Sequence, residues 1–397
     1  MRFLSFFFLM LMSSNGITQC GNRYNAAIFP NVKTTTYQFG ENITYTGANQ
    51  KLNLDLYTPI GDTTPSGDLF KNRPCIVFCF GGAFVSGTRT SPELTFFASS
   101  LAQRGFVCAS IDYRLDNQAN MTANGENGSV IRAVQDAKAA VRFLKSKSAD
   151  FGIDSTMMFI GGTSAGGVTA LTLGYSQFNE LSDSVKTAIN SLGGWEGSTN
   201  NLSQSSQVKG IFNFAGAILD TAHIVANDLP IYLNHANGDA TVPFRSGYPL
   251  NGQSKTFMHG SFNIAQRMKE KGNYYVLDSF SSTNHPAFAD PNILTGLGLL
   301  NTTLENLRKF LYKVMKCDQA TGNIQTKNQA SLILENPVKS VLYFNEEINL
   351  NDISLYNLLG NRISLEIENS NSVSILHLPR GLYILKYKDV VQKLIFE

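Results

Sequence analysis

The sequence is poor in charge, and the charge it has is balanced. Charged residues make up 16% of the 397 residues, the formal net charge is +2, and no sustained basic run occurs. Nothing in this pattern points to nucleic acid or an anionic membrane surface as a partner. No apolar stretch reaches the length of a transmembrane segment. The apolar content of 43% is that of a foldable globular protein.

Cysteine and histidine are scarce, with five of each. No spacing among them suggests a metal site. Cys75, Cys79 and Cys108 fall in apolar strand-like runs, where buried and unreactive thiols are usual. Cys20 and Cys317 flank the main domain, and export would allow a disulfide between them. That pairing is a hypothesis.

The N-terminus has the pattern of a targeting signal. Arg2 precedes an almost wholly apolar run, residues 3–12, and a polar stretch follows. This order predicts a secretory signal peptide over residues 1–18. A lipoprotein anchored through Cys20 is the alternative, which the bulky Gln19 disfavours. We therefore expect an exported protein.

Short apolar runs alternate with helical patterns through most of the chain. Leu52, Leu54 and Leu56 alternate with polar residues, as in a half-buried strand, whereas residues 74–80 are apolar on both faces, as in a covered central strand. Further strands are expected at residues 105–111, 157–160, 208–214, 230–235 and 274–277, and helices at 92–104, 131–144 and 261–271. This alternation predicts an α/β fold with a doubly wound, mostly parallel sheet.

The centre of the pattern is Gly162-Thr163-Ser164-Ala165-Gly166, which joins a predicted strand to a predicted helix. So tight a turn leaves Ser164 in a strained backbone conformation, and flanking glycines remove Cβ atoms that would clash. The serine oxygen is then held at a helix N-terminus, where developing negative charge is favoured. The motif predicts a nucleophile; the alternative is a Gly/Ser-rich loop.

Two further polar residues follow predicted strands at the edge where α/β sheets gather their chemistry. Asp239 comes after the strand at 230–235, and His285 comes after the strand at 274–277. The chain order Ser164, Asp239, His285 is that of a nucleophile-elbow hydrolase. In this scheme His285 takes the serine proton, and Asp239 fixes the imidazole tautomer.

Other side chains compete for these roles. The rival acids are Asp220, Asp278 and Asp290, and the rival histidines are His223, His235, His259 and His377. Chain order favours Asp239 and His285 over all of them, and we expect His235 to be a structural hydrogen-bonding group. Asp112 and Arg114 are expected to form a structural ion pair in a turn.

The loop after residues 74–80 can bring bare backbone N–H groups close to a ligand. We expect the N–H groups of Gly82, Ala83 and Ala165 to form an oxyanion hole. Phe84 and the single tryptophan, Trp195, are candidate walls for an acyl or aromatic group. Trp195 lies in a long insert, residues 175–207, whose length predicts either a lid or a solvated surface excursion.

These motifs together resemble the α/β-hydrolase superfamily over residues 23–316. The closest branch is its carboxylesterases, near the hormone-sensitive-lipase-like and feruloyl/acetyl-xylan esterase groups. Two departures stand out. Phe80 occupies the position where the family usually has the His of its His-Gly-Gly loop, and Ala236 replaces a common Gly beside the acid. Because that His supports the loop, we expect altered loop packing with the chemistry retained.

The C-terminal part of the chain has a different character. Residues 318–331 read as a polar linker, after a catalytic domain spanning 19–317. Short strands with turn signals then predict a small all-β sandwich over 332–397. A carbohydrate-binding or scaffolding module is the alternative. Four motifs, at residues 336–338, 355–360, 378–385 and 393–397, resemble the C-terminal sorting domain of the type nine (Por) secretion system.

That resemblance implies a bacterium of the Bacteroidetes kind, passage through the periplasm, and the secretion machinery as a partner. The protein is then expected to be secreted or held at the outer cell surface. We interpret the whole chain as a serine carboxylesterase that acts through an acyl-enzyme without metal or organic cofactor. Its substrates would be acetyl or feruloyl esters of plant polysaccharide, or short-chain esters. The alternatives are a serine peptidase of the same fold and a non-catalytic, surface-displayed binding protein.

Overall fold

A computed structural model divides the chain into two compact units, residues 1–321 and 322–397. The expected signal peptide (1–18) and linker (318–331) lie outside the described residues. The described residues are 20, 22–64, 66–117, 123–200, 203–290 and 292–317 in the larger unit, and 338, 340–344, 349, 352–357, 361–369, 372–387 and 390–396 in the smaller one.

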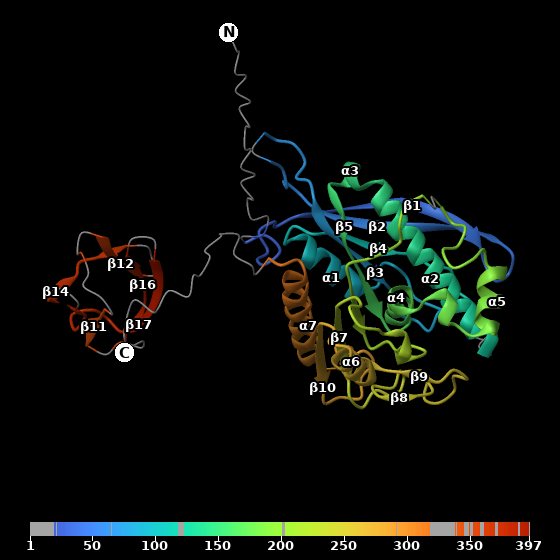
Figure 1. Ribbon diagram of the computed structural model, residues 1–397. Helices are drawn as coiled ribbons and strands as arrows, with labels where there is room; N and C mark the ends of the chain where they lie inside the picture. The colour runs from blue at the N-terminus through green and yellow to red at the C-terminus, as the bar shows by residue number, and fades with distance from the viewer. Residues whose placement is uncertain are drawn as a thin grey trace, which may run out of the picture. The chain divides into compact units, whose positions relative to one another are not determined.

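The larger unit is built on an eight-stranded sheet with the order β1-β2-β4-β3-β5-β6-β7-β10 (Figure 1). The pairs β1–β2 and β2–β4 are antiparallel, and all the others are parallel. The mostly parallel sheet is confirmed. Its strands are β1 (Val32–Ile43), β2 (Asn49–Pro59), β3 (Arg73–Cys79), β4 (Val107–Ile111), β5 (Ile153–Thr163), β6 (Gly210–Phe214), β7 (Ile231–Ala236) and β10 (Tyr275–Phe280).

Helices cover both faces of this sheet. α1 and α7 pack together on one face, α2 and α4 pack together on the other, and α5 packs on α2 (Figure 1). A two-stranded ribbon, β8 (Ser246–Gly247) and β9 (Met258–His259), lies between β7 and α6 in the chain. The helices are α1 (Pro92–Ala102), α2 (Ala123–Ser146), α3 (Ser148–Phe151), α4 (Ala165–Tyr175), α5 (Asp183–Ser191), α6 (Ser261–Glu270) and α7 (Ile293–Val314), with 3-10 turns η2 (Phe178–Glu180) and η3 (Thr221–His223).

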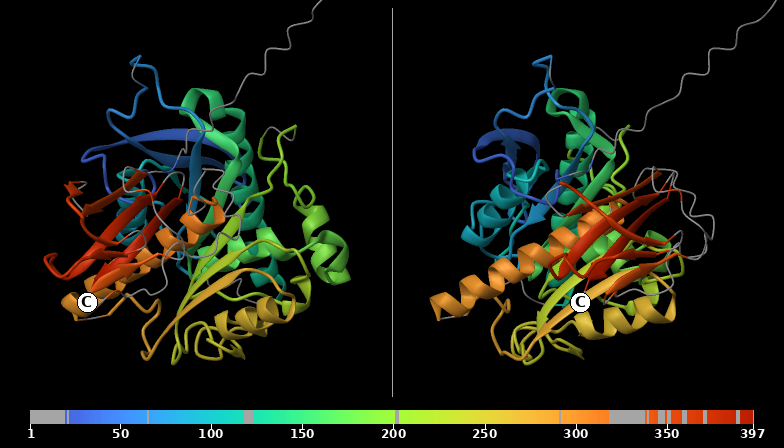
Figure 2. Two further views of the ribbon diagram at one scale, coloured as in Figure 1. Left: turned by 60° about the vertical axis from the view of Figure 1, so that its left-hand side comes forward. Right: turned by 90° about the vertical axis from the view of Figure 1, so that its left-hand side faces the viewer.

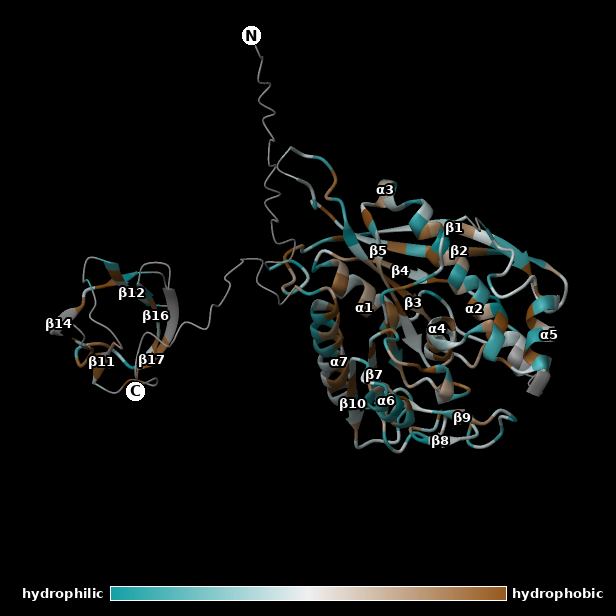
Figure 3. Ribbon diagram, in the orientation of Figure 1, coloured by the Kyte–Doolittle hydropathy of each residue, from teal (hydrophilic) through white to brown (hydrophobic). Residues whose placement is uncertain are grey.

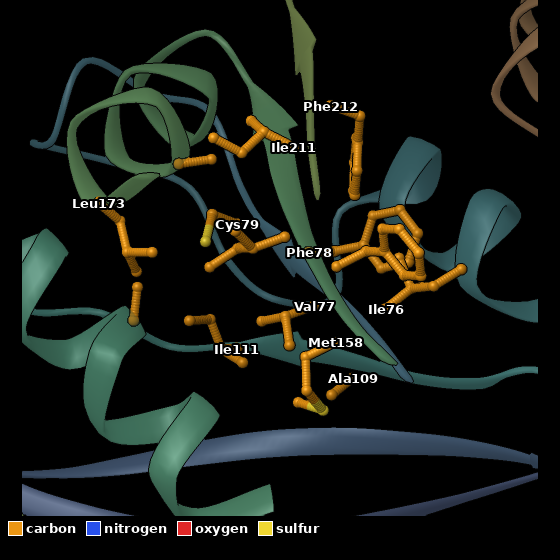
Figure 4. Packing of buried hydrophobic residues seen from close by; sticks show 14 of the residues in the cluster. Ile76, Val77, Phe78, Cys79, Ala109, Ile111, Met158, Leu173, Ile211 and Phe212 are labelled. Carbon is orange, nitrogen blue, oxygen red and sulfur yellow. The ribbon is translucent and has the colours of Figure 1, made fainter. Parts of the chain in front are cut away.

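The central strands are apolar because both of their faces are covered. Every residue of β3 is buried, and alternate side chains point to opposite faces. Figure 4 shows Phe78 beside Phe212 on one side of the strand, and Cys79 with Leu173 of α4 on the other. The hydrophobic colouring of Figure 3 is accordingly concentrated on the central strands.

The smaller unit contains two antiparallel sheets, β13-β12-β16-β17 and β11-β15-β14 (red in Figure 2). They share a core that includes Leu342, Leu355, Val373, Leu385 and Leu394. The small β sandwich is confirmed. Its strands are β11 (Val341–Tyr343), β12 (Ile353–Asn357), β13 (Arg362–Ile363), β14 (Glu366–Asn369), β15 (Ser372–Ser374), β16 (Gly381–Tyr387) and β17 (Val390–Phe396).

The cysteines divide as the sequence suggested. A disulfide joins Cys20 to Cys317. The other three thiols are free and buried. Burial raises the pKa of Cys75 and of Cys79 to about 12, and that of Cys108 well above its usual range. They are therefore protonated core side chains.

The expected ion pair between Asp112 and Arg114 is wrong. Residues 112–117 form no turn that would bring the two side chains together. Asp112 instead pairs with Arg89, while Arg114 pairs with the buried carboxylate of Asp136 on α2, at 2.9 Å. The backbone N–H of Arg114 donates to the same carboxylate. The second pair fastens the chain after β4 to α2.

Because the Arg114–Asp136 pair is almost wholly excluded from water, removing one partner leaves an uncompensated buried charge. We predict that Asp136→Asn lowers the free energy of unfolding by about 3–5 kcal/mol. The matched control is Asp150→Asn, whose pair with Lys147 is exposed and worth less than about 1 kcal/mol. Urea unfolding measures both, and equal effects in the two variants would contradict the assignment.

Candidate active site

Ser164 sits at the sharp turn between β5 and α4. Its backbone angles are φ 54° and ψ −115°, a strained conformation for a residue with a side chain. Its N–H donates to the carbonyl of Phe214 on the neighbouring β6, at 2.7 Å. A Cβ at either Gly162 or Gly166 would lie 2.0 Å from the carbonyl oxygen of Cys79. Glycine is therefore required at both positions of the motif.

An unbroken chain of hydrogen bonds joins Ser164 to His285 and Asp239. The Oγ of Ser164 lies 2.7 Å from Nε2 of His285, and Nδ1 of His285 lies 2.6 Å from Oδ2 of Asp239. Asp239 follows β7 and His285 follows β10, adjacent parallel strands whose carboxyl ends meet at one edge. An ionised carboxylate only accepts hydrogen bonds, so Nδ1 of His285 carries the proton and Nε2 is left to accept from Ser164.

Asp239 is held as an ionised carboxylate. Its Oδ1 accepts the N–H groups of Thr241 and Val242, and Nε2 of His235 lies 3.3 Å from its Oδ2. Burial alone would raise the pKa of Asp239, but hydrogen bonds from His235 and His285 outweigh burial and bring it to about 2. His235 also bonds the carbonyl of Val242. It is a structural group, as expected, although the sequence did not indicate its contact with the acid.

None of the rival side chains in the larger unit bonds Ser164 or His285 in the described structure. Asp278 accepts from the hydroxyl of Tyr232, and Asp290 accepts from Asn284. The remaining rivals are bonded elsewhere: Asp220 to the N–H of Ala222, His223 to Ser176, and His259 to Ser246. His377 belongs to the smaller unit.

The expected oxyanion loop follows β3. Gly82 and Ala83 both have positive φ, 123° and 52°. A Cβ at Gly82 would lie 2.2 Å from the carbonyl oxygen of Ser86, so only glycine fits there. Among the described residues, the N–H groups of Gly82, Ala83 and Ala165 have no hydrogen-bond acceptor, and that of Ala165 lies in the first turn of α4. All three are available to a ligand.

Phe80 and Tyr113 support this loop where the resembled family uses histidine. The two rings stack at 4.1 Å between centroids, 15° from parallel. The Tyr113 hydroxyl donates to the carbonyl of Phe80 at 2.9 Å. The stacking and this hydrogen bond thus hold Phe80, at the start of the loop, in place. The sequence placed Phe80 at the position of the family's histidine, but it did not indicate Tyr113 as its partner.

A largely apolar cavity of about 120 Å³ opens on Ser164. Both predicted wall residues, Phe84 and Trp195, line it, together with Val168 and Met258. The indole of Trp195 lies 4.1 Å from Nζ of Lys138 on α2, a cation–π contact. The structure therefore places the two predicted wall residues around one space beside the serine.

The insert at 175–207 packs against α2 through polar contacts. Glu196 pairs with Lys138 and Arg142, both almost wholly buried. The side-chain amide of Gln135 donates to the carbonyls of Leu192 and Gly194. These contacts hold the segment that carries Trp195, and the insert forms one wall of the cavity.

The fold and this arrangement of residues define an α/β-hydrolase. Residues 54–253, just over half of the chain, match the family model BD-FAE, and residues 335–396 match the secretion system C-terminal sorting domain. The chain belongs to the BD-FAE family. Its sorting domain marks it for secretion to the outside of the cell.

Individual relatives support the same grouping. The chain is 26% identical over 224 residues to the probable isoprenylcysteine alpha-carbonyl methylesterase ICMEL1 of Arabidopsis thaliana, covering 50% of this chain and 43% of that protein. It is 30% identical over 129 residues to the esterase LipC of Mycobacterium tuberculosis, covering 31% and 30%. The chain therefore matches less than half the length of these curated relatives.

Solved structures share the fold. The propionate-bound esterase Est2 of Thermogutta terrifontis superposes with a TM-score of 0.51 at 23% identity, covering 71% of this chain and 94% of that one. Its native form gives the same TM-score and identity. In the described part of this chain, no helix is both long and apolar enough to cross a membrane.

Because the pKa of Asp239 is depressed, we predict that its contribution to the free energy of unfolding depends on pH. A carboxyl whose folded pKa lies below its unfolded value stabilises the protein above the unfolded pKa and loses that contribution as pH falls through the folded one. With values of 3.8 and about 2, the free-energy difference between wild type and Asp239→Asn should shrink by about 2 kcal/mol between pH 5 and pH 2. Urea unfolding across this range measures it, and a pH-independent difference would contradict the assignment.

Proposed function

We propose that this chain is a secreted serine carboxylesterase whose nucleophile is Ser164. The observation that carries the proposal is the hydrogen-bonded chain from Asp239 through His285 to Ser164 at the mouth of an apolar cavity. A serine hydroxyl becomes an effective nucleophile when an adjacent imidazole takes its proton. Membership of an esterase family supports the same reaction class.

In the first half-reaction, Oγ of Ser164 forms a bond to the ester carbonyl carbon while its proton moves to Nε2 of His285. The negative charge that develops on the carbonyl oxygen is met by the N–H groups of Gly82, Ala83 and Ala165, each contributing about 3 kcal/mol. The ester C–O bond then breaks, and His285 gives its proton to the leaving alcohol.

In the second half-reaction, water attacks the acyl-Ser164 ester with His285 again as the base. The acid product leaves, and the proton returns to Oγ of Ser164. Asp239 stays ionised throughout because its pKa is about 2. Its negative charge stabilises the imidazolium that forms in each half-reaction.

The apolar cavity supports an acyl or aryl group as the part of the ester that is bound. We propose acetyl or feruloyl esters of plant polysaccharide, or short-chain esters, as the substrates. The sorting domain would bring the secretion machinery as the partner. No observation favours the peptidase or the non-catalytic binding protein over this proposal.

Ser164→Ala should abolish hydrolysis of p-nitrophenyl acetate and butyrate, with kcat falling by about 10⁶ to the level of residual binding and oxyanion stabilisation. The matched control is Ser191→Ala, an exposed serine on α5 that bonds only its own helix; it should leave kcat within twofold. Hydrolysis that survives in Ser164→Ala would contradict the assignment of the nucleophile.

Asp239→Asn should lower kcat by about 10⁴ with KM little changed, because the amide no longer holds the proton of His285 on Nδ1. Asp220→Asn is the matched control, since Asp220 is an exposed cap of η3. Steady-state kinetics on p-nitrophenyl butyrate at pH 7 compares the two. Equal losses would show that Asp239 has no particular role.

A further inference from the structure

One face of α4 forms a long wall of the cavity beside Ser164. Ser164, Val168, Thr172 and Ser176 all line the cavity, and they are spaced four residues apart. Residues four apart on a helix stand one above the other on the same face. The cavity therefore runs along α4, from its N-terminal end at Ser164 toward its C-terminal end at Ser176.

The four residues Ser164, Val168, Thr172 and Ser176 form a row along the helix, the α4 row, and its length follows from helix geometry. A rise of 1.5 Å per residue separates Ser164 from Thr172 by about 12 Å, and from Ser176 by about 18 Å. Leu181 and Val185 of the insert also line the cavity. At the C-terminal end of α4 the Ser176 hydroxyl lies 3.1 Å from Nδ1 of His223, and both residues are buried. The row thus ends in a polar pair.

The acyl group and the alcohol of a bound ester lie on different sides of Ser164. Their positions follow from the leaving alcohol, which must receive a proton. The leaving alcohol oxygen must lie beside Nε2 of His285 to receive it. Among the described residues that line the cavity, Ser164, Ala83 and Ala165 are present and His285 is not. The alcohol therefore lies toward His285 outside the cavity, and the cavity is left for the acyl group.

We infer that the acyl group lies along the α4 row, from Ser164 past Val168 toward Thr172, so that among the esters proposed above the enzyme prefers straight acyl chains longer than acetyl to acetyl itself. The inference rests on the proposed function. An extended chain advances about 1.2 Å per single bond, so an octanoyl chain spans most of the distance to Thr172. The end of an octanoyl chain would therefore lie near Thr172, which is half-buried on the cavity wall.

The test is the chain-length profile of the purified chain on p-nitrophenyl acetate, butyrate, hexanoate and octanoate. For wild type, kcat/KM should rise with length, by up to about fourfold for each methylene that is buried. Thr172→Phe should lower the octanoate-to-butyrate ratio of kcat/KM at least tenfold. A long side chain on a helix leans toward the preceding turn, so the ring would cover the row between Thr172 and Val168.

The matched control is Thr187→Phe, the same change at an exposed position of α5, which should keep the ratio within twofold. Two results would overturn the proposed position of the acyl group. One is an octanoate-to-butyrate ratio of kcat/KM that Thr172→Phe leaves unchanged, and the other is a wild-type kcat/KM that falls steadily from acetate to octanoate. Neither result touches the proposed function, which the wild type's hydrolysis of butyrate decides separately. A wild type that hydrolyses none of these esters would overturn both.

Discussion

The backbone at Ser164 is the constraint on which the rest of the site depends. A non-glycine residue at φ 54° persists only where its surroundings hold it there. Here β5 and β6 supply the N–H to carbonyl bond, and α4 begins directly after the serine. The strain holds Oγ clear of the backbone at the edge where β7 and β10 also end. Asp239 and His285 can then reach it from neighbouring strands.

The second feature that shapes the site is its electrostatics, which depend on the charge of Asp239. The carboxylate of Asp239 is removed from water, a costly position that hydrogen bonds from His235, His285 and two backbone N–H groups outweigh. Its negative charge then fixes the protonated nitrogen of His285. A second negative charge, which would develop on the carbonyl oxygen of the substrate, faces the bare N–H groups of the Gly82–Ala83 loop and of α4. The site therefore carries a negative charge at Asp239 and presents hydrogen-bond donors to a second negative charge at the Gly82–Ala83 loop and the start of α4.

Much of this could be predicted from the sequence because the relevant signals are local. The Gly-x-Ser-x-Gly motif reports a backbone requirement that only glycine meets, as the 2.0 Å approaches to Cys79 demonstrate. The apolar runs of β3 and β4 indicate buried strands, and the catalytic candidates could be identified because they follow predicted strands in the chain order Ser164, Asp239, His285. β1 was not predicted, because this edge strand leaves nearly all of its side chains at least partly exposed and has no apolar alternation to detect.

Long-range partners were the part that the sequence did not disclose. Arg114 was matched to its neighbour Asp112, whereas the buried partner is Asp136, twenty-two positions away on α2. Three other contacts likewise result from packing. They are the stacking of Tyr113 on Phe80, the contact of His235 with Asp239, and the cation–π contact of Lys138 with Trp195. Each depends on how two elements meet, which no pattern within either element encodes.

We propose that the hydrogen bonds from Asp239 through His285 make Ser164 a nucleophile. The most direct measurement is labelling with a small phosphonyl fluoride, followed by peptide mass spectrometry of the wild type and of His285→Gln. We expect one phosphonyl group per chain, located on Ser164, and labelling slower in the variant by about 10³ or more. Modification of another residue, or equal rates in the two proteins, would contradict it.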